Sequence, residues 1–597
     1  MPKRFQIAFR NISKTFPNES YAWRKKTIRT SFIRTTEMAL FALTSPFWNN
    51  IKFKKRLSLS KKTLSLIKEW NDGPPRPKIF LTPHYCYVEM IPHVKSVLER
   101  DFIGEIGAIF RPLNQKALDD WIKQSRERNG FRLLSRKKGF QEARNILKNN
   151  GSVGVLFDQR AGGTGTLMMS QGRLTSATEL PAILAKESHA DVYLVVARRV
   201  SFMKCQIDTI PVHQYTDSAD ITLLGNKAFD DYLIENKELA QDWLWVHDRW
   251  RIHNKINQRL NLNHKRSLIR RQMALFGWEK LPQKTKIWIR MPFEFDEFVQ
   301  GLFFVHAVIK GRPDAEVTLI GPEYGGWILS HLDLDVKYLR LKIPFISKWR
   351  QHMKWREQNP DTVIILQKNN KTAIESISLG SPQTVGMDCN KGSRLFHHRA
   401  PIGNAEIPKT NFDKYFTKYI KLGKYMGLED NKLNLDRMVI PASEKNINNE
   451  AAYVIINNTR IEKSVISILR QRSPNLKIHT LRFLKPEPVP TALLWPEIFT
   501  NFKIKKTTVI SDQLSWILLT RAYGLNGLFI KNQKTENIEF FPEITTSLNF
   551  NSKMNIHSLT WDESQRDACK SKFETFLNHY MCPQERDTLQ EPVETTS

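Results

Sequence analysis

The stretch KIFLTPHYCYVE, residues 78–89, starts as an apolar run and ends with a histidine placed five residues before a glutamate. A short apolar run of this kind, preceded by a Pro/Gly-rich break at 73–77, is typical of a buried β-strand. Pro83 fixes its own backbone and disfavours helix just before it, so we expect the strand to end in a loop at His84. Residues five apart on one continuous helix point about 140° apart. His84 and Glu89 can therefore meet only if the histidine lies in the loop and the glutamate lies on the next element.

A loop histidine with a carboxylate partner is a general-base arrangement. A carboxylate that accepts one imidazole N–H fixes the tautomer and leaves the other ring nitrogen free to take a proton from a hydroxyl. Because the stretch carries no serine or cysteine elbow, we expect that hydroxyl to belong to a substrate. For an isolated histidine and glutamate at this spacing, a loop histidine bonded to backbone is the commoner outcome. The assignment therefore depends on the rest of the sequence.

The charge balance points to an anionic partner. The chain has 597 residues, with 91 Lys and Arg against 60 Asp and Glu, a net charge of +31. Such an excess is typical of proteins that bind nucleic acid or an anionic membrane surface. Aromatic residues do not interleave with the cations as a base-stacking surface requires, and no nucleic-acid-binding motif is present, which favours the membrane over nucleic acid. The five cysteines lie far apart without a CxxC pair, so we expect neither a metal site nor a disulfide framework.

The cations concentrate at the N-terminus. The first 70 residues hold sixteen Lys and Arg but only three Asp and Glu, and they surround the apolar stretch MALFALTSPFW at 38–48. That stretch is shorter than the ~20 residues of a spanning helix. Two interpretations are open and compatible: a segment that lies in the membrane interface, or an ordinary helix packed on the first domain with a solvated basic face.

Two α/β regions follow. Apolar runs at 153–157 and 192–198 enclose an amphipathic run at 180–187, which predicts a first α/β domain. After the basic stretch RIHNKINQRLNLNHKRSLIRRQ at 251–272, seven more short apolar runs predict strands of two doubly wound halves. They lie at 286–292, 315–321, 362–367, 452–458, 476–481, 507–512 and 527–530.

Five blocks in order give the first region a family resemblance. They are H-x4-E at 84–89, FRPLN at 110–114, RERNG at 126–130, DQRAG at 158–162 and WLWVHDRW at 243–250. Residues of about 20–255 thereby resemble the bacterial lipid A late acyltransferase family, the lauroyl- and myristoyltransferases. The resemblance implies transfer of a fatty acyl chain from acyl carrier protein, or another thioester donor, to a hydroxyl of a lipid A precursor or related glycolipid. It also implies a peripheral or weakly anchored place at the cytoplasmic face of the inner membrane, and no cofactor.

The resemblance assigns expected roles to individual residues. His84 is the general base and Glu89 its orienting carboxylate. Arg111 faces a phosphate of the acceptor or the thioester oxygen. Asp158 and the backbone of Gly162 and Gly163 shape the acceptor pocket.

The region from about 284 to 550 is similar to the heptosyltransferases of lipopolysaccharide core assembly, which have a two-lobed glycosyltransferase fold. The pieces that carry the similarity are IWIRMPFEFDEFVQG, DAEVTLIGPEYGGWI and the run LGSPQTVGMD at 379–388. The family's glycine turn for the donor diphosphate is missing, since that place reads SDQLSWILLTRAYG at 511–524. The similarity leaves Glu297, Arg460, Lys463 and Asp512 as candidates for a nucleotide-sugar site. Heptosyl transfer, alone or beside acyl transfer, therefore stays open as the alternative function, with a nucleic-acid-binding protein as a distant one.

We thus expect a lysophospholipid-acyltransferase-like α/β domain followed by a two-lobed Rossmann-like glycosyltransferase region. The predicted order is a basic membrane-interface segment at 1–70, an acyltransferase domain at 71–255 and a basic linker at 256–283. Glycosyltransferase-like lobes follow at 284–407 and 450–550, joined by a connector at 408–449, and a C-terminal helix and polar tail occupies 551–597.

Overall fold

The structure, a computed structural model, describes most of residues 3–428. Its gaps there are 99–103, 111–119, 122, 124–125, 128–129, 136–138, 213–216, 251–255, 263–265, 331, 333, 342–344, 368–369, 389–394 and 403–410. Farther on it describes 451–455, 465–467, 469–470, 477–480, 507–511, 526–532 and 556–561. The chain divides into two compact units, Met1–Thr285 and Lys286–Ser597.

A seven-stranded sheet is the centre of the first unit, with the strand order β1-β9-β8-β2-β5-β3-β4. The strands are β1 (Leu57–Leu59), β2 (Lys78–Thr82), β3 (Ile106–Phe110), β4 (Phe131–Ser135), β5 (Ser152–Leu156), β8 (Asp191–Ser201) and β9 (Lys204–Val212). Only the hairpin pair β8 and β9 is antiparallel among the pairings described for this sheet. The predicted strands at 78–82, 153–157 and 192–198 are confirmed as β2, β5 and β8.

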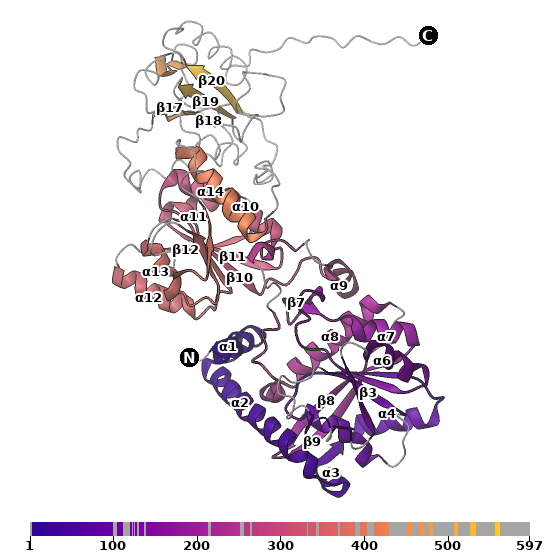
Figure 1. Ribbon diagram of the computed structural model, residues 1–597. Helices are drawn as coiled ribbons and strands as arrows, with labels where there is room; N and C mark the ends of the chain where they lie inside the picture. Colours follow the sequence, from indigo (N-terminus) through magenta and orange to yellow (C-terminus); the bar gives the residue numbers. More distant parts are fainter. Residues whose placement is uncertain are drawn as a thin grey trace, which may run out of the picture. The chain divides into compact units, whose positions relative to one another are not determined.

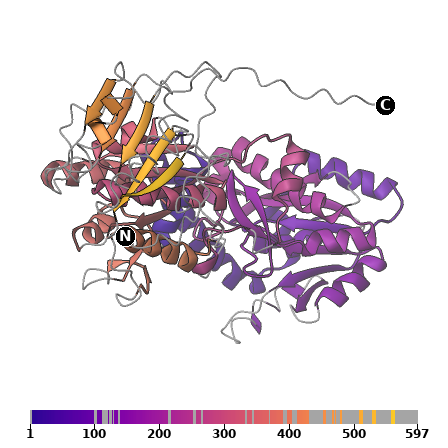
Figure 2. The same ribbon diagram turned by 90° about the horizontal axis from the view of Figure 1, so that it is seen from above.

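Both faces of this sheet are covered, which explains why its central strands read as continuous apolar runs. Along β2, Ile79 and Leu81 face a core formed with α6 (Gly139–Lys148), α7 (Leu180–Ser188) and α8 (Ser218–Glu235). Phe80 faces the opposite core, formed with α3 (Asn50–Arg56), α4 (Lys61–Asp72) and the 3-10 helix η2 (Val88–Val97). Figures 1 and 2 show these helices on either side of the sheet.

The N-terminal 70 residues are part of this unit and not a separate segment. Helix α1 (Lys3–Thr15) and helix α2 (Tyr21–Thr44) bury Ala8, Ile12 and Ile28 in the first core. After the short 3-10 helix η1 (Ser45–Phe47) and α3, strand β1 joins the edge of the sheet beside β9. Among the described residues, none of the helices combines the length and apolar character that a bilayer crossing requires.

The basic stretch at 256–283, which the sequence suggested as a linker or an exposed helix, contains helical elements in the structure. The stretch begins with a short 3-10 helix η4 (Ile256–Gln258). Helix α9 (Ile269–Phe276) packs against the hairpin of β6 (Thr166–Ser170) and β7 (Arg173–Ala177). Gln272 donates to the Met169 carbonyl at 2.9 Å, and Arg271 pairs with Asp220 at 2.7 Å. Besides the hairpin contacts of Ile269 and Met273, Leu275 and Phe276 pack against the cluster that contains Leu223 of α8.

The second unit contains two further sheets, each described here by itself. The first has the order β12-β11-β10-β13-β14-β15 and the second β17-β16-β18-β19-β20. Their strands are β10 (Thr285–Arg290), β11 (Ala315–Gly321), β12 (Val336–Arg340), β13 (Thr362–Ile365), β14 (Thr384–Met387), β15 (His398–Ala400), β16 (Ala451–Ile455), β17 (Lys477–Thr480), β18 (Thr507–Ser511), β19 (Asn526–Asn532) and β20 (Ile556–Trp561). The described pairings are parallel, which confirms the predicted α/β class with mostly parallel sheets.

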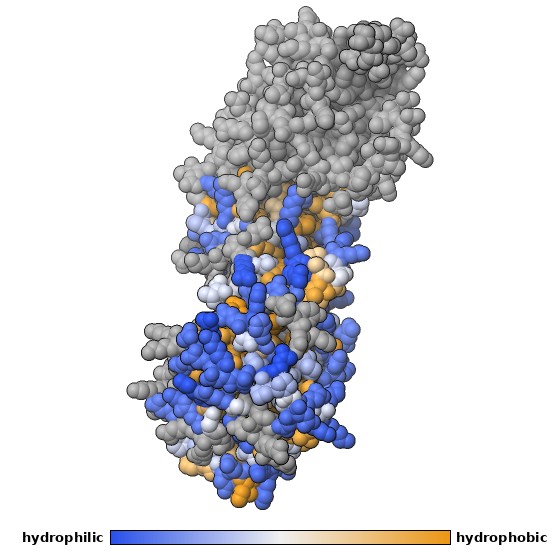
Figure 3. Space-filling view, turned by 90° about the vertical axis from the view of Figure 1, so that its right-hand side faces the viewer, coloured by the Kyte–Doolittle hydropathy of each residue, from blue (hydrophilic) through white to orange (hydrophobic). Residues whose placement is uncertain are grey.

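The helices described beside the first of these sheets are α10 (Phe295–Gly311), α11 (Glu323–Leu329), α12 (Phe345–Arg356), α13 (Asn370–Ser378) and α14 (Asn411–Met426). Helix α14 lies in the predicted connector, and β20 lies where a C-terminal helix was expected. On the face shown in Figure 3, the surface of the first unit is mainly hydrophilic, with hydrophobic side chains in separate spots.

Candidate active site

The topology of the first sheet brings His84 and Asp158 together. Strands β2 and β5 are parallel neighbours, with Thr82 beside Leu156 at their carboxyl ends. The loops that follow them therefore leave the same edge of the sheet. His84 Nδ1 lies 2.6 Å from Asp158 Oδ1, and the backbone N–H of His84 donates to Asp158 Oδ2 at 2.9 Å. Two bonds to one carboxylate fix both the position and the tautomer of the histidine ring.

Asp158 is held from two further sides. The Trp243 indole donates to Asp158 Oδ2 at 2.7 Å, and the buried Arg249 guanidinium donates to the Asp158 carbonyl. Burial alone would raise the pKa of this carboxyl, but the charge and hydrogen bond of His84, the Trp243 donor and the Arg249 charge outweigh it and lower the pKa. Asp158 is thus a buried carboxylate in its charged form.

The pKa of His84 shifts in the opposite direction. Burial disfavours the protonated ring, but the charge and hydrogen bond of Asp158, together with the more distant charge of Glu89, outweigh burial and raise the pKa above its ordinary value of 6.5. A stronger base results, which stays partly exposed: 18 % of the side chain is accessible. Those are the properties of a general base that works near neutral pH.

Glu89 does not occupy the place predicted for it. Three residues separate His84 from helix η2, which then directs Glu89 toward Arg126. The guanidinium binds both carboxylate oxygens, with Nε to Oε2 at 2.8 Å and Nη2 to Oε1 at 2.6 Å. The expectation of a His84–Glu89 hydrogen bond was therefore wrong for this structure, because Asp158 from the neighbouring strand takes the Nδ1 position. Glu89 acts on the histidine through its charge.

The other ring nitrogen of His84 also has a partner, which sequence reasoning missed. The side-chain amide nitrogen of Gln159 lies 2.7 Å from His84 Nε2 and 2.6 Å from His247 Nε2. Burial first, and then the charge of a protonated His84, lower the pKa of His247 to about 4, so its ring is neutral at pH 7. Gln159 and His247 belong to two of the five sequence blocks, DQRAG and WLWVHDRW. Their place in these blocks was the one sequence signal that could have pointed to them as site residues.

Two apolar pockets lie under the face of the sheet that carries Phe80. One is lined by Glu89 and Arg126 at its polar side and by apolar residues of η2, β3, β4 and β5. The other extends beneath α4, where Ile67 and Trp70 line it. Both are lined by Thr82, Ile91, Phe131 and Gly154. The pockets thus share a boundary and reach the strand ends that precede His84 and Asp158.

Residues 1–252 match the family model of the bacterial lipid A biosynthesis acyltransferases. This part of the chain is therefore similar to that family over 252 of the 597 residues. The resemblance predicted from the five sequence blocks is confirmed, and the first unit is called the acyltransferase unit from here on. A comparison with functionally curated proteins gave no match.

Solved structures resemble this chain over about half of its length. The heptosyltransferase WaaC of E. coli, solved with ADP-2-deoxy-2-fluoro heptose, is 13% identical, with 49% of this chain and 99% of that chain covered and a TM-score of 0.33. The ADP-heptose lipopolysaccharide heptosyltransferase II of E. coli is 11% identical, with 49% of this chain and 98% of that chain covered and a TM-score of 0.36. A glycosyl transferase of family 9 from Veillonella parvula is 11% identical, with 48% of this chain and 89% of that chain covered and a TM-score of 0.34.

The N-terminal helices hold the segment of the acyltransferase unit that carries Trp243 and His247. The Ser31 hydroxyl on α2 donates to the Trp243 carbonyl at 2.8 Å. The Asn11 amide on α1 donates to the carbonyls of Trp245 and His247 at 3.1 and 2.9 Å. The N-terminal helices therefore position residues that surround His84.

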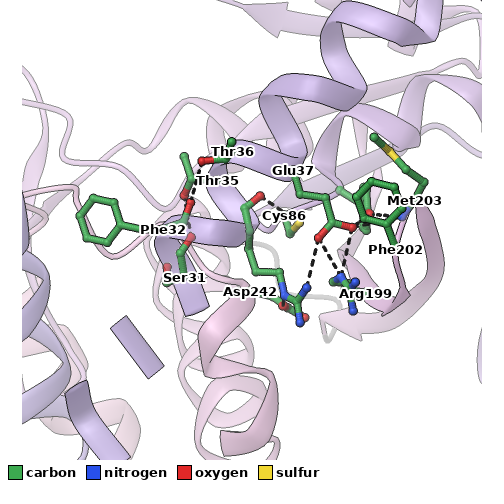
Figure 4. A network of polar contacts seen from close by, with 12 residues as sticks. Ser31, Phe32, Thr35, Thr36, Glu37, Cys86, Arg199, Phe202, Met203 and Asp242 are labelled. Atoms are coloured by element: carbon green, nitrogen blue, oxygen red, sulfur yellow. Dashed lines mark hydrogen bonds and ion pairs between the residues drawn. The ribbon is translucent and has the colours of Figure 1, made fainter. Parts of the chain in front are cut away.

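A buried cluster of charges centred on Glu37 continues this support, and Figure 4 shows it. The Glu37 carboxylate on α2 accepts from the Arg199 Nε at 3.0 and 3.2 Å, from the Met203 N–H at 3.1 Å and from the Tyr87 hydroxyl. Arg34, one turn earlier, pairs with Glu37 at 3.1 Å and with Asp242 at 3.4 Å. The cluster joins α2 to the loop after His84, to the β8–β9 hairpin and to the residue before Trp243.

The contribution of the cluster to the free energy of unfolding depends on pH. Burial opposes the charge of Glu37, but its hydrogen bonds and Arg199 outweigh burial and lower its pKa. A depressed carboxyl pKa contributes stability above the ordinary value of 4.5, and the contribution disappears as pH falls through the folded-state pKa. Glu37→Ala leaves the half-buried Arg34 and Arg199 short of a partner and should lower the free energy of unfolding by about 3 kcal/mol at pH 7.

Chemical denaturation at pH 7 and pH 4 measures this effect. The difference between wild type and Glu37→Ala should shrink at pH 4. Thr36→Ala is the matched control, because Thr36 is exposed on the same helix and its hydroxyl donates to the Phe32 carbonyl at 3.2 Å. Equal losses for the two variants at pH 7 would contradict the importance of the cluster.

Of the remaining predicted site residues, the structure describes three and leaves four outside the described residues. Gly162, with φ of +67°, and Gly163 form the turn after Gln159, and the Ser176 hydroxyl of β7 donates to the Gly162 carbonyl at 2.9 Å. In the second unit, Glu297 on α10 is buried with its carboxylate 3.9 Å from Lys418 Nζ of α14. Arg111, Arg460, Lys463 and Asp512 lie outside the described residues.

Proposed function

We propose that the acyltransferase unit moves a fatty acyl chain from a thioester, such as acyl-acyl carrier protein, to a hydroxyl of a lipid A precursor or a related glycolipid. The observation that carries this proposal is the His84–Asp158 pair, which follows the carboxyl ends of β2 and β5, where Thr82 and Leu156 line an apolar pocket. Among the described residues, no serine or cysteine nucleophile is bonded to the His84 ring, which suits an acceptor that brings its own hydroxyl. The family match supplies the lipid A precursor as the expected acceptor.

The geometry supports a direct transfer. His84 Nε2 takes the proton of the acceptor hydroxyl while that oxygen attacks the thioester carbonyl carbon, forming a C–O bond. Asp158, bonded to Nδ1, stabilises the imidazolium that results. The tetrahedral intermediate then breaks its C–S bond, and the departing thiolate receives the proton from His84. This sequence replaces the predicted His84–Glu89 mechanism with a His84–Asp158 mechanism, to which Glu89 contributes charge.

The apolar pockets suit the acyl chain. Their lining is almost wholly aliphatic and aromatic, and an alkyl chain gains about 0.8 kcal/mol for each CH2 that leaves water. The charged residues Glu89 and Arg126 lie on the first pocket, on the side where the thioester and the donor's polar part would sit. Purified protein incubated with acyl-acyl carrier protein and a lipid A precursor, followed by mass spectrometry of the lipid, tests the proposal. A lipid that keeps its original mass with donors of several chain lengths would refute it.

The outer side of α2 and α3 suits an anionic membrane surface at the cytoplasmic face of the inner membrane. Ile33, Leu40 and Leu43 form an exposed stripe along α2, spaced so that they share one side of the helix. Phe47 and Ile51 continue the exposed apolar residues, followed on α3 by exposed Lys52, Lys54 and Lys55. Apolar side chains next to cations are the composition of interfacial helices.

Leu40→Ser with Leu43→Ser should therefore weaken binding to vesicles that contain anionic phospholipid by at least about 10-fold, since each lost leucine removes roughly 1.5–3 kcal/mol of apolar burial. Co-sedimentation with such vesicles measures the change. Ile374→Ser, at an equally exposed apolar residue of the second unit, is the control. Retention of wild-type vesicle binding by the double variant would place the membrane contact elsewhere.

For the second unit, the described residues offer little support for sugar transfer. Glu297, the one candidate for the nucleotide-sugar site that the structure describes, is buried and paired with Lys418. A carboxylate used inside the packing of two helices is poorly placed to take a proton from a sugar hydroxyl.

A further inference from the structure

The contact between Gln159 and two histidine rings determines which protons the three residues carry. His84 Nδ1 faces the ionised Asp158, so the proton of the neutral ring lies on Nδ1 and Nε2 holds a lone pair. His247 is neutral, and its Nε2 faces the same amide. A primary amide has two N–H bonds, one for each lone pair. The reverse orientation, with the amide oxygen between the rings, would require an N–H on Nε2 of both.

This arrangement occupies the lone pair that the reaction needs. In the substrate-free protein, the amide of Gln159 covers His84 Nε2 at 2.7 Å. An acceptor hydroxyl must bond to that same nitrogen before it can be deprotonated. The hydroxyl therefore displaces Gln159 from His84 and frees one amide N–H, while the other N–H remains on His247.

The freed donor lies where negative charge develops. The attacking oxygen occupies the position next to His84 Nε2 that Gln159 has left, and the thioester carbonyl lies about 3 Å from that oxygen. We propose that Gln159 is a catalytic residue with two successive tasks: it caps the base in the free enzyme, and then it donates a hydrogen bond to the carbonyl oxygen as that oxygen becomes an oxyanion. His247 is a positioning residue that keeps the amide nitrogen turned toward the site.

The inference rests on the proposed acyl transfer, and the two tasks make separate measurements possible. A donor on Nε2 stabilises the neutral ring of His84, so Gln159→Ala should raise the pKa of His84 in a substrate-free NMR titration. In acyl transfer, loss of one oxyanion donor should lower kcat by about 100-fold with a smaller change in KM. Gln159→Glu, which cannot donate to the oxyanion and adds negative charge, should raise the pKa of His84 further and lower kcat more than the alanine variant.

Thr164→Ala is the control from the same loop, because its hydroxyl donates to the Ala161 carbonyl at 3.3 Å within the turn. Gln159→Asn is the second variant should alanine impair folding. Its side chain is one methylene shorter, so its amide cannot span both rings, and kcat should fall with an unchanged Tm.

An unchanged His84 titration together with a wild-type kcat in Gln159→Ala overturns the inference. A raised His84 pKa with unchanged kcat overturns the oxyanion task. Wild-type protein without acyl transfer refutes the proposed function and the oxyanion task with it, while the titration still decides whether Gln159 caps the base.

Discussion

Asparagine in place of Asp158 lowers kcat for acyl transfer by about 10³- to 10⁴-fold. The carboxylate accepts the Nδ1 proton of His84 at 2.6 Å, whereas an asparagine amide can turn an N–H toward the ring and place the histidine proton on Nε2. The base is then lost although the ring keeps its position. Steady-state kinetics at saturating donor measure the effect, and thermal unfolding of the variant checks that the buried site still folds.

Glu89→Gln provides the comparison, because it removes the carboxylate that the sequence pattern favoured as the partner. Glu89 is bonded to Arg126 and reaches His84 only through its charge, so we expect a loss of roughly 10-fold, corresponding to about 1.4 kcal/mol. The negative charge of Glu89 helps to raise the pKa of His84, so its removal should lower that pKa. The acid limb of kcat/KM should therefore move to lower pH. If Glu89→Gln loses as much activity as Asp158→Asn, Glu89 must turn to His84 in the working complex.

The contrast between these two carboxylates shows what the sequence could predict. The apolar runs before His84 and Asp158 were sufficient to predict two strands, and the five blocks were sufficient to predict the family. The pairing of His84 with Asp158 spans 74 residues and depends on β2 and β5 being neighbours in the sheet. Strand order is a tertiary property that no local pattern contains. The local H-x4-E spacing therefore offered Glu89, which is close in sequence but bonded elsewhere.

The N-terminus shows the same limit for packing. The stretch at 38–48 was open to two interpretations, a packed helix or an interfacial segment. The structure buries Phe41 and Trp48 in the core while Leu40, Leu43 and Phe47 stay exposed. The two interpretations thus describe opposite sides of one segment. Of the partners of Glu37, Arg34 is local, but Arg199 and Met203 are distant in sequence, so no local pattern could predict the whole cluster.

Valine in place of Gly154 should change the acyl chain length that the enzyme accepts. Gly154 lies on β5 and lines both pockets. A Cβ added at this residue would lie 3.8 Å from the Gly107 carbonyl oxygen and 3.9 Å from the Ala108 Cβ. These are ordinary contacts, so the strand can accept a β-branched residue. The added methyl groups occupy space at the boundary between the pockets. The part of an acyl chain that passes this boundary is then excluded.

Excluding about four methylenes costs roughly 3 kcal/mol, or about 200-fold in kcat/KM for long donors, while donors short enough to end before Gly154 keep their rate. A series of acyl-acyl carrier protein donors of increasing length measures the profile. Gly154→Ala should give a smaller shift in the same direction, because it adds one methyl group instead of three carbons. The test separates a blocked pocket from a damaged site: an equal loss for every donor length would mean that the substitution disturbs His84 and Asp158, and an unchanged profile would mean that the chain does not pass Gly154.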